Sequence, residues 1–168
     1  PSVLDPAVAG DSLDGLLSVY SLSKQSNLAG YRAALVAGSA QLVSQLLKNR
    51  KHLGLMPPAP VQHAMAVALG DDEHVARQRE IYRARREVLK PAVEAAGFQV
   101  DGSEAGLYLW ITEGRGAWES MGRLAELGIL AGPGVFYGEH YPNHVRLSLT
   151  ASDDRVAEAA ARLRAAVN

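Results

Sequence analysis

Cysteine is absent from the 168 residues, and the sequence also lacks a long apolar run and an excess of either charge. Without cysteine, no disulfide, thiolate metal site or cysteine nucleophile can form. No apolar run approaches the roughly 20 residues of a membrane-spanning helix. The 17 basic and 18 acidic side chains give a formal net charge of −1, which argues against electrostatic binding to nucleic acid or to a membrane. We therefore expect neither partner, and we predict a cytoplasmic location.

Other motifs are also missing. The five histidines have no spacing typical of metal ligands, so we expect no metal site. No Ser-His-Asp arrangement typical of a serine hydrolase is visible either. The first ten residues lack the basic and apolar regions of a signal peptide. Because the chain does not begin with Met, we expect that the natural protein starts upstream of Pro1.

Apolar periodicity divides the chain into two blocks, with a boundary near Gly97. In the first block, two short strands flank a polar loop, Ser23 to Arg32, which is too short for a helical crossover and therefore predicts antiparallel strands. A long helix follows, and Pro91 should kink it. Its arginines at 77, 79, 83 and 86 should form a solvent-exposed face. The expected strands are residues 16–22, 33–37, 98–100, 107–112, 129–131 and 145–149, and the expected helices begin near residues 40, 60, 73, 117 and 153.

The most informative segment is S-L-S-K-Q-S-N-L-A-G-Y-R, Ser21 to Arg32. A lysine in a serine-flanked loop can be an ordinary surface residue. Here an arginine follows it by eight positions, so Lys24 could form a Schiff base with an aldehyde while Arg32 and the Ser21 hydroxyl bind a dianionic phosphate. Gly30 permits a close approach of the backbone.

This segment resembles the cofactor-lysine signature of class I and II aminotransferases, which belong to the aspartate-aminotransferase-like superfamily of fold type I. The resemblance implies that Lys24 holds pyridoxal phosphate covalently and that Ser21 and Arg32 bind its phosphate. Lys24 would also be the catalytic residue, moving a proton between the substrate Cα and the cofactor during a ping-pong transamination.

Three later segments resemble the same family in the expected order: A-G-L-Y-L-W from Ala105, G-I-L-A-G-P-G-V-F-Y-G from Gly128, and H-V-R-L-S-L-T from His144. An arginine inside an apolar strand is costly unless its charge is paired. Arg146 could therefore make a structural ion pair. The resemblance implies instead that Arg146 binds the substrate α-carboxylate.

The resemblance also implies an α/β fold in which residues 1–72 end a large cofactor domain with a mostly parallel sheet and an antiparallel strand. Residues 73–96 would form the kinked connecting helix, and residues 97–168 a small C-terminal α+β domain. Family members are homodimers, and the earlier half of a complete enzyme supplies further cofactor contacts. We therefore expect that these 168 residues alone are catalytically incomplete.

The run from S-L-S-K-Q-S-N-L-A-G-Y-R-A-A-L-V-A-G through R-K-H-L-G-L-M-P-P-A-P-V-Q-H-A-M-A-V-A-L to A-G-L-Y-L-W resembles the succinyldiaminopimelate transaminases of lysine biosynthesis. This resemblance implies N-succinyl-2,6-diaminopimelate with 2-oxoglutarate or glutamate as substrates. Two alternatives stay open. The protein could be another aminotransferase or a pyridoxal-phosphate lyase, such as a carbon–sulfur lyase, because these share the lysine signature. It could also be a catalytically incomplete fragment acting as a structural partner.

Overall fold

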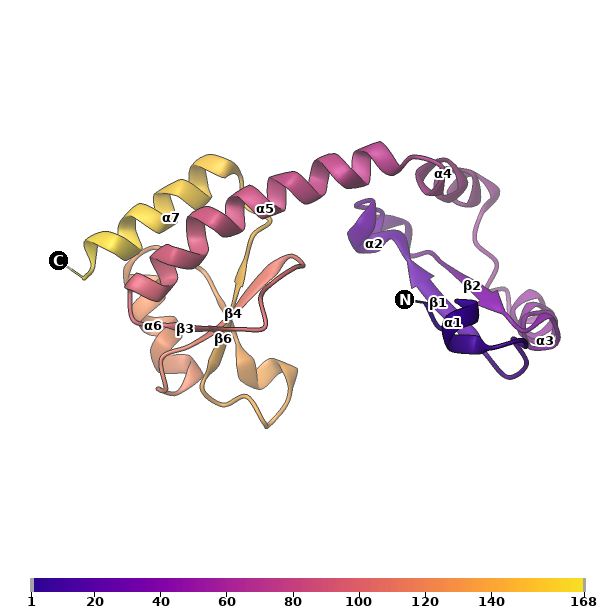
Figure 1. Cartoon of the computed structure of the whole chain (residues 1–168), viewed down its shortest axis with the longest axis horizontal. Coiled ribbons are helices and arrows are strands. Elements are labelled where there is room, and N and C mark those ends of the chain that lie inside the picture. The colour runs from indigo at the N-terminus through magenta and orange to yellow at the C-terminus, as the bar shows by residue number, and fades with distance from the viewer. Residues whose placement is uncertain (1, 168) are drawn as a thin grey trace. The chain divides into compact units, whose positions relative to one another are not determined.

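The computed structural model describes residues 2–167 (Figure 1). The chain divides into two compact units between Ala76 and Arg77. The longest helix, α5 (Asp72–Ala95), runs across this division and is continuous through Pro91. Within residues 2–167, no helix combines the length and the apolar character needed to cross a bilayer. The division of the sequence into segments 1–72, 73–96 and 97–168 of a larger fold stays a prediction.

The first unit contains a two-stranded antiparallel sheet, as the short connection predicted. Val19 lies opposite Val36 in this sheet. Gly38 ends the second strand with φ +142°, and a Cβ there would lie 2.2 Å from the Leu16 carbonyl oxygen, so only glycine fits. The elements are α1 (Pro6–Ala9), β1 (Leu17–Ser21), α2 (Leu22–Gln25), a 3-10 turn (Ala29–Tyr31), β2 (Ala34–Gly38), α3 (Ala40–His52) and α4 (Ala59–Leu69).

One expectation for this unit is wrong. The segment from Ser23 to Arg32 is not an irregular loop, because it contains α2 and the 3-10 turn. In the described part of the chain, β1 pairs only with β2, and Val19 in the middle of β1 is 71% exposed.

The second unit contains a four-stranded sheet of order β3-β4-β6-β5 in which every neighbouring pair is antiparallel. Helices α5 and α7 lie side by side (Figure 1), joined by hydrogen bonds from Arg85 to Asp153 and from Arg164 to the Val88 carbonyl. The elements are β3 (Gln99–Asp101), β4 (Tyr108–Thr112), α6 (Ala117–Glu126), β5 (Gly132–Pro133), a 3-10 turn (Gly134–Tyr137), β6 (His144–Ser148) and α7 (Asp153–Ala165).

Two details of this unit also correct the sequence prediction. The strand expected at 129–131 lies instead at Gly132–Pro133, because the Ile129 N–H bonds back to the Leu124 carbonyl and closes the end of α6. Arg86 is only partly exposed to solvent: it donates to the Gly106 carbonyl, and its Nε is buried. Arg83 does lie on an exposed face, where it pairs with two glutamates of its own helix.

The two faces of the four-stranded sheet have opposite character, because successive side chains of a strand alternate between faces. One face is completely buried and packs against residues of α5, α6 and α7 in the main hydrophobic core. This face carries Leu109, Ile111, Val145 and Leu147. The other face carries aromatic and polar side chains, and these come from the alternate positions of β4 and β6: Tyr108, Trp110, Thr112, His144, Arg146 and Ser148.

Candidate active site

Lys24 lies on α2, the single helical turn that follows β1 directly. The Ser21 hydroxyl caps this turn, accepting a hydrogen bond from the Ser23 N–H at 3.2 Å and donating to the Ser23 hydroxyl at 2.8 Å. Leu22 anchors the turn because its side chain is fully buried. Lys24 itself is exposed, and no residue among 2–167 makes a hydrogen bond or ion pair with its amine. The amine is therefore available for chemistry.

Arg32 follows the 3-10 turn in a left-handed conformation, with φ +50°, and its guanidinium donates to the Ala29 carbonyl at 2.9 Å. Ser21, Ser23 and Arg32 line one cavity of about 690 Å³ within the first unit. Lys24 is not among the lining residues. Two hydroxyls and a guanidinium form a donor set suited to a phosphate. Sequence reasoning missed Ser23, although the S-x-S pattern beside Lys24 contains it.

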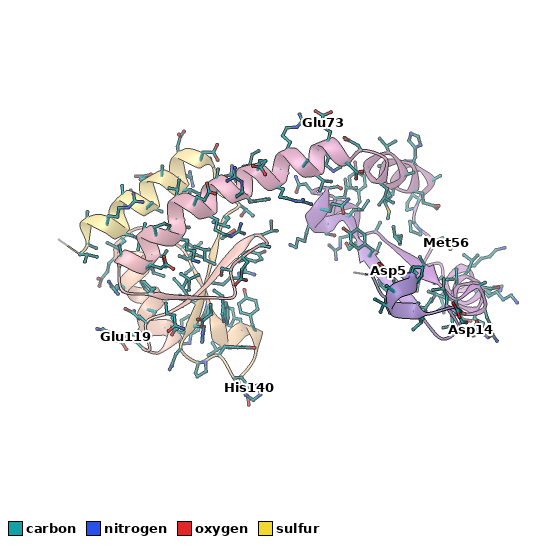
Figure 2. All side chains as sticks on the ribbon, viewed as in Figure 1. Asp5, Asp14, Met56, Glu73, Glu119 and His140 are labelled. Atoms are coloured by element: carbon teal, nitrogen blue, oxygen red, sulfur yellow. The ribbon has the colours of Figure 1, made fainter. Side chains whose placement is uncertain are left out.

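The remaining walls of this cavity are mainly aliphatic. They come from β1, β2, α3 and α4, and from Met56, which lies in the loop between α3 and α4 (Figure 2). These side chains include Val19, Val36, Val43, Leu46 and Met65. The cavity therefore has an anion-binding edge and an apolar body, which is the usual composition of a site for a cofactor or small molecule.

A second cluster in the first unit was not visible in the sequence. The Ser26 hydroxyl lies 3.0 Å from His74 Nε2, and His74 Nδ1 lies 3.2 Å from the Asp71 carboxylate. Asp71 also accepts hydrogen bonds from the backbone N–H groups of Glu73 and His74. The His74 N–H is the main reason that the pKa of Asp71 is below its ordinary value. The Asp71 side chain is half exposed and is hydrogen-bonded to the start of α5. The Ser-His-Asp chain therefore has a structural role, since it links the end of α2 to the start of α5.

Arg146 lies on the aromatic face of the four-stranded sheet. Its guanidinium carbon is 4.1 Å from the ring centre of Tyr108 and 5.0 Å from that of Tyr137. Its Nε is buried without a hydrogen-bond partner, and no carboxylate of residues 2–167 pairs with it. Within the described part of the chain, Arg146 therefore makes no structural ion pair. Arg146 lines a cavity of about 460 Å³ together with Gly102, Ser103, Tyr108, Trp110, Tyr137 and Tyr141.

His144 lies beside this cavity. Its ring stacks on Trp110 at 5.2 Å, and its Nε2 is 3.0 Å from the Asp101 carboxylate. This hydrogen bond, followed by one from Gln99, lowers the pKa of Asp101. His140 lies on the exposed loop before β6 (Figure 2). Within residues 2–167, no three His, Cys, Asp or Glu side chains are grouped to hold a metal ion.

Comparison with known proteins places these features in a family. A sequence profile described as "Aminotransferase class I and II" matches residues 4–163. The chain is 57% identical over 162 residues to the 4-dedimethylamino-4-oxo-anhydrotetracycline transaminase OxyQ of Streptomyces rimosus, covering 96% of this chain and 45% of that protein. It is 35% identical over 168 residues to an LL-diaminopimelate aminotransferase of Aquifex aeolicus, covering 98% and 43%.

A solved structure described as a probable N-succinyldiaminopimelate aminotransferase from Thermus thermophilus matches with a TM-score of 0.80 and 28% identity, covering 99% of this chain and 45% of that one. This match confirms the predicted α/β fold. The chain spans less than half the length of these relatives. Members of the matched family use pyridoxal phosphate. The family profile covers all four predicted site residues, and the chain therefore belongs to the class I and II aminotransferases.

Proposed function

We propose that the protein transfers amino groups between an amino acid and a 2-oxo acid, with pyridoxal phosphate bound by Lys24, Ser21 and Arg32. The observation that carries this proposal is the arrangement of the lysine segment. The capped turn presents an unpaired amine, and the capping hydroxyl and the arginine eight positions later line one cavity. The donor set fits the phosphate, and the apolar walls fit a ring.

The residues divide the work by their chemistry. When bound, the cofactor withdraws electrons from the substrate Cα and so makes its proton removable. The Lys24 amine holds the cofactor aldehyde covalently, and once free it takes the Cα proton and returns it as general base and acid. The Arg32 guanidinium and the Ser21 hydroxyl hold the phosphate dianion, which fixes the ring relative to the amine.

Arg146 is our proposed substrate residue. A guanidinium can bind a carboxylate through two parallel hydrogen bonds, which fixes orientation as well as position. Arg146 has these donors free of any carboxylate of residues 2–167, and it lines a cavity that can admit a ligand. Every amino acid and 2-oxo acid has such a carboxylate, so the same contact serves both halves of the reaction.

The substitution Lys24→Ala tests the central proposal in the complete protein. We expect amino transfer to fall by about 10²- to 10⁴-fold, because the proton-transfer group is lost. We also expect loss of the visible absorbance that comes from the covalently attached cofactor. Lys48→Ala is the matched control, because Lys48 is an exposed lysine on α3. Unchanged activity in Lys24→Ala would refute the proposed chemistry, as would a wild-type protein that binds no cofactor.

The reaction type needs its own measurement. A pyridoxal-phosphate lyase would release ammonia or pyruvate from an amino acid without a 2-oxo acid. We expect amino transfer that depends on added 2-oxo acid and stops without it. Release of ammonia or pyruvate alone would favour the lyase, and the absence of both activities would favour a catalytically incomplete chain.

For the substrate, we propose N-succinyl-2,6-diaminopimelate with 2-oxoglutarate or glutamate, in lysine biosynthesis. The likeness to the Thermus structure and to the Aquifex protein supports this choice, because both are named for diaminopimelate compounds. A second candidate, amino transfer to a ring ketone, is favoured by the 57% identity to OxyQ. Comparing kcat/KM for the succinylated amine, LL-diaminopimelate and an anhydrotetracycline ketone separates the candidates.

We also propose that the protein is a cytoplasmic homodimer, in line with the family resemblance. Light scattering of the complete protein measures its mass directly. A monomeric mass at assay concentrations would remove this part of the proposal without affecting the lysine chemistry. Cell fractionation tests the location in the same independent way.

A further inference from the structure

Three arginines of the second unit lie over aromatic rings, and one of them differs from the others. Arg85 lies over Tyr82 at 5.8 Å and is paired with Asp153. Arg123 lies over Phe98 at 5.2 Å and is paired with Glu113. Both also donate to backbone carbonyls. The third, Arg146, is closer to its ring, has two rings instead of one, and has no ion pair or hydrogen bond within residues 2–167.

The two rings beside Arg146 come from different elements. Tyr108 lies on β4, the strand next to β6, and Tyr137 ends the 3-10 turn that follows β5. Gly132 on β5 lies opposite Arg146 in the sheet. A Cβ at this glycine would lie 3.4 Å from the Tyr137 hydroxyl and 4.0 Å from Arg146 Nε. The Tyr137 hydroxyl and the Arg146 side chain therefore both lie close to Gly132.

An aromatic ring and a carboxylate bind an arginine side chain differently. The attraction comes from the negative face of the ring and uses none of the N–H donors of the guanidinium. An arginine held by a carboxylate, such as Arg123 with Glu113, has already used donors and has its charge compensated. Arg146 lies against two rings with its donors unused, and its Nε is buried without a hydrogen-bond partner.

We infer that Tyr108 and Tyr137 are positioning residues that hold the Arg146 guanidinium between their rings, ready to bind the substrate carboxylate. The inference rests on the proposed role of Arg146 in carboxylate binding. Tyr137 is the better position for a test substitution, because it lies in a turn, whereas Tyr108 is part of the sheet. The sandwich pre-orders the side chain, so less rotamer entropy is lost when the carboxylate binds.

Binding of a non-reacting probe tests the inference in the complete protein loaded with cofactor. The probe is 3-phenylpropionate, which has one carboxylate and neither an amino nor a keto group. We expect Tyr137→Leu to raise its Kd by about 3- to 30-fold, the loss expected for one cation–π contact. Tyr137→Phe should stay near the wild-type Kd because it keeps the ring. Phe136→Leu is the matched control, since Phe136 is in the same turn, is 71% exposed and contacts Trp118.

A spectroscopic readout reports the sandwich directly. The nitrogen-bound Nε proton of Arg146 should resonate upfield of an ordinary arginine because it lies near two ring faces, and Arg146→Gln identifies the signal by removing it. Tyr137→Leu should move the signal downfield, and Tyr137→Phe should not. The signals of Arg85 and Arg123 should stay unchanged in all three variants. Tyr108→Leu provides a second, independent removal of a ring, with the same expected direction.

The outcomes separate the inference from the proposed function. If Arg146→Gln loses the probe while Tyr137→Leu and Tyr108→Leu bind it as the wild type does, the positioning role is wrong and the carboxylate role stands. If Arg146→Gln binds the probe normally, the carboxylate role and the inference are both wrong. In steady-state assays, a positioning role requires Tyr137→Leu to raise KM more than it lowers kcat, and equal KM values in the two proteins would overturn it.

Discussion

The two units of the chain differ most in how much apolar surface they bury. Of the eighteen hydrophobic residues that are buried among residues 2–167, sixteen form one cluster between Leu89 and Leu163 in the second unit. In the described part of the first unit, only Leu22 and Met65 are buried to this degree. The second unit therefore has a core that can hold it folded. In the first unit, Lys24 lies on the short turn α2 that follows β1, and among the described residues β1 pairs only with β2.

This difference has a consequence for the proposed functional residues of each unit. Arg146 is placed by a strand whose neighbours, Val145 and Leu147, are fully embedded in the core. Lys24 is placed by one short turn, and what fixes that turn is local: the buried Leu22, the Ser21 cap and the tie from Ser26 to His74. We therefore expect the position of Arg146 to depend on the stability of the whole second unit, and the position of Lys24 to depend on the few local contacts listed above.

The largest expected effect is a contrast between two leucines. Leu124 in α6 is completely buried in the core, whereas Leu53 at the end of α3 is 71% exposed. We expect Leu124→Ala to lower the free energy of unfolding by about 2–5 kcal/mol, because it leaves a cavity. Leu53→Ala should change it by no more than about 0.5 kcal/mol. Urea denaturation of both variants measures the difference, and a loss at Leu53 as large as that at Leu124 would contradict the expected contrast between these two positions.

A smaller effect is expected at His74. His74→Ala removes the contacts to Ser26 and Asp71, and each such hydrogen bond contributes roughly 0.5–1.5 kcal/mol. We expect local opening of α2 to become easier by about 1 kcal/mol, seen as faster amide hydrogen exchange around Lys24. The control is His63→Ala, because His63 is exposed on α4 of the same unit.

Two results would contradict this view of the lysine segment. Exchange around Lys24 that is no faster in His74→Ala than in the wild type would mean that the tie to α5 does not restrain α2. Equal acceleration in His63→Ala would mean that the first unit loosens as a whole, so that no particular contact holds Lys24.

The sequence predicted what depends on neighbouring residues and missed what depends on distant ones. The antiparallel pairing of β1 and β2 followed from a connection too short for a helix. The turn α2 was missed because S-x-S-K has no apolar periodicity, and a single turn is fixed by one cap and one buried leucine. Strand β5 was misplaced because Ile129 is apolar but is used to close α6.

The candidate site shows the same division. Ser21 and Arg32 lie within twelve residues of each other and line one cavity, whereas Lys24 is not among its lining residues, so the predicted association of all three stays a prediction. The contact of Ser26 with His74 joins residues 48 positions apart, and the placement of Tyr137 against Arg146 needs the register of β5, β6 and the turn between them. No periodicity encodes either contact.

The smallest expected effect concerns acid, and it compares one aspartate in each unit. The hydrogen bond from His144, and then that from Gln99, lowers the pKa of Asp101, while the His74 N–H lowers that of Asp71. A lowered pKa in the folded state stabilises the fold above the ordinary aspartate pKa of about 3.9, and this contribution is lost as the pH falls through the lower folded value. The Asp101 side chain is 37% exposed, so we expect well under about 1 kcal/mol.

Asp101→Asn provides the measurement. Its stability deficit relative to the wild type should be constant near neutral pH and should shrink as the pH falls below about 4, because the wild type then loses the same interaction. Asp14→Asn, at an exposed loop position (Figure 2), should show no such convergence. Because Asp101 belongs to the unit with the core, its effect should appear in global unfolding. The corresponding effect of Asp71 should appear only in local exchange around α2, and global effects of equal size from both aspartates would mean that the two units unfold together.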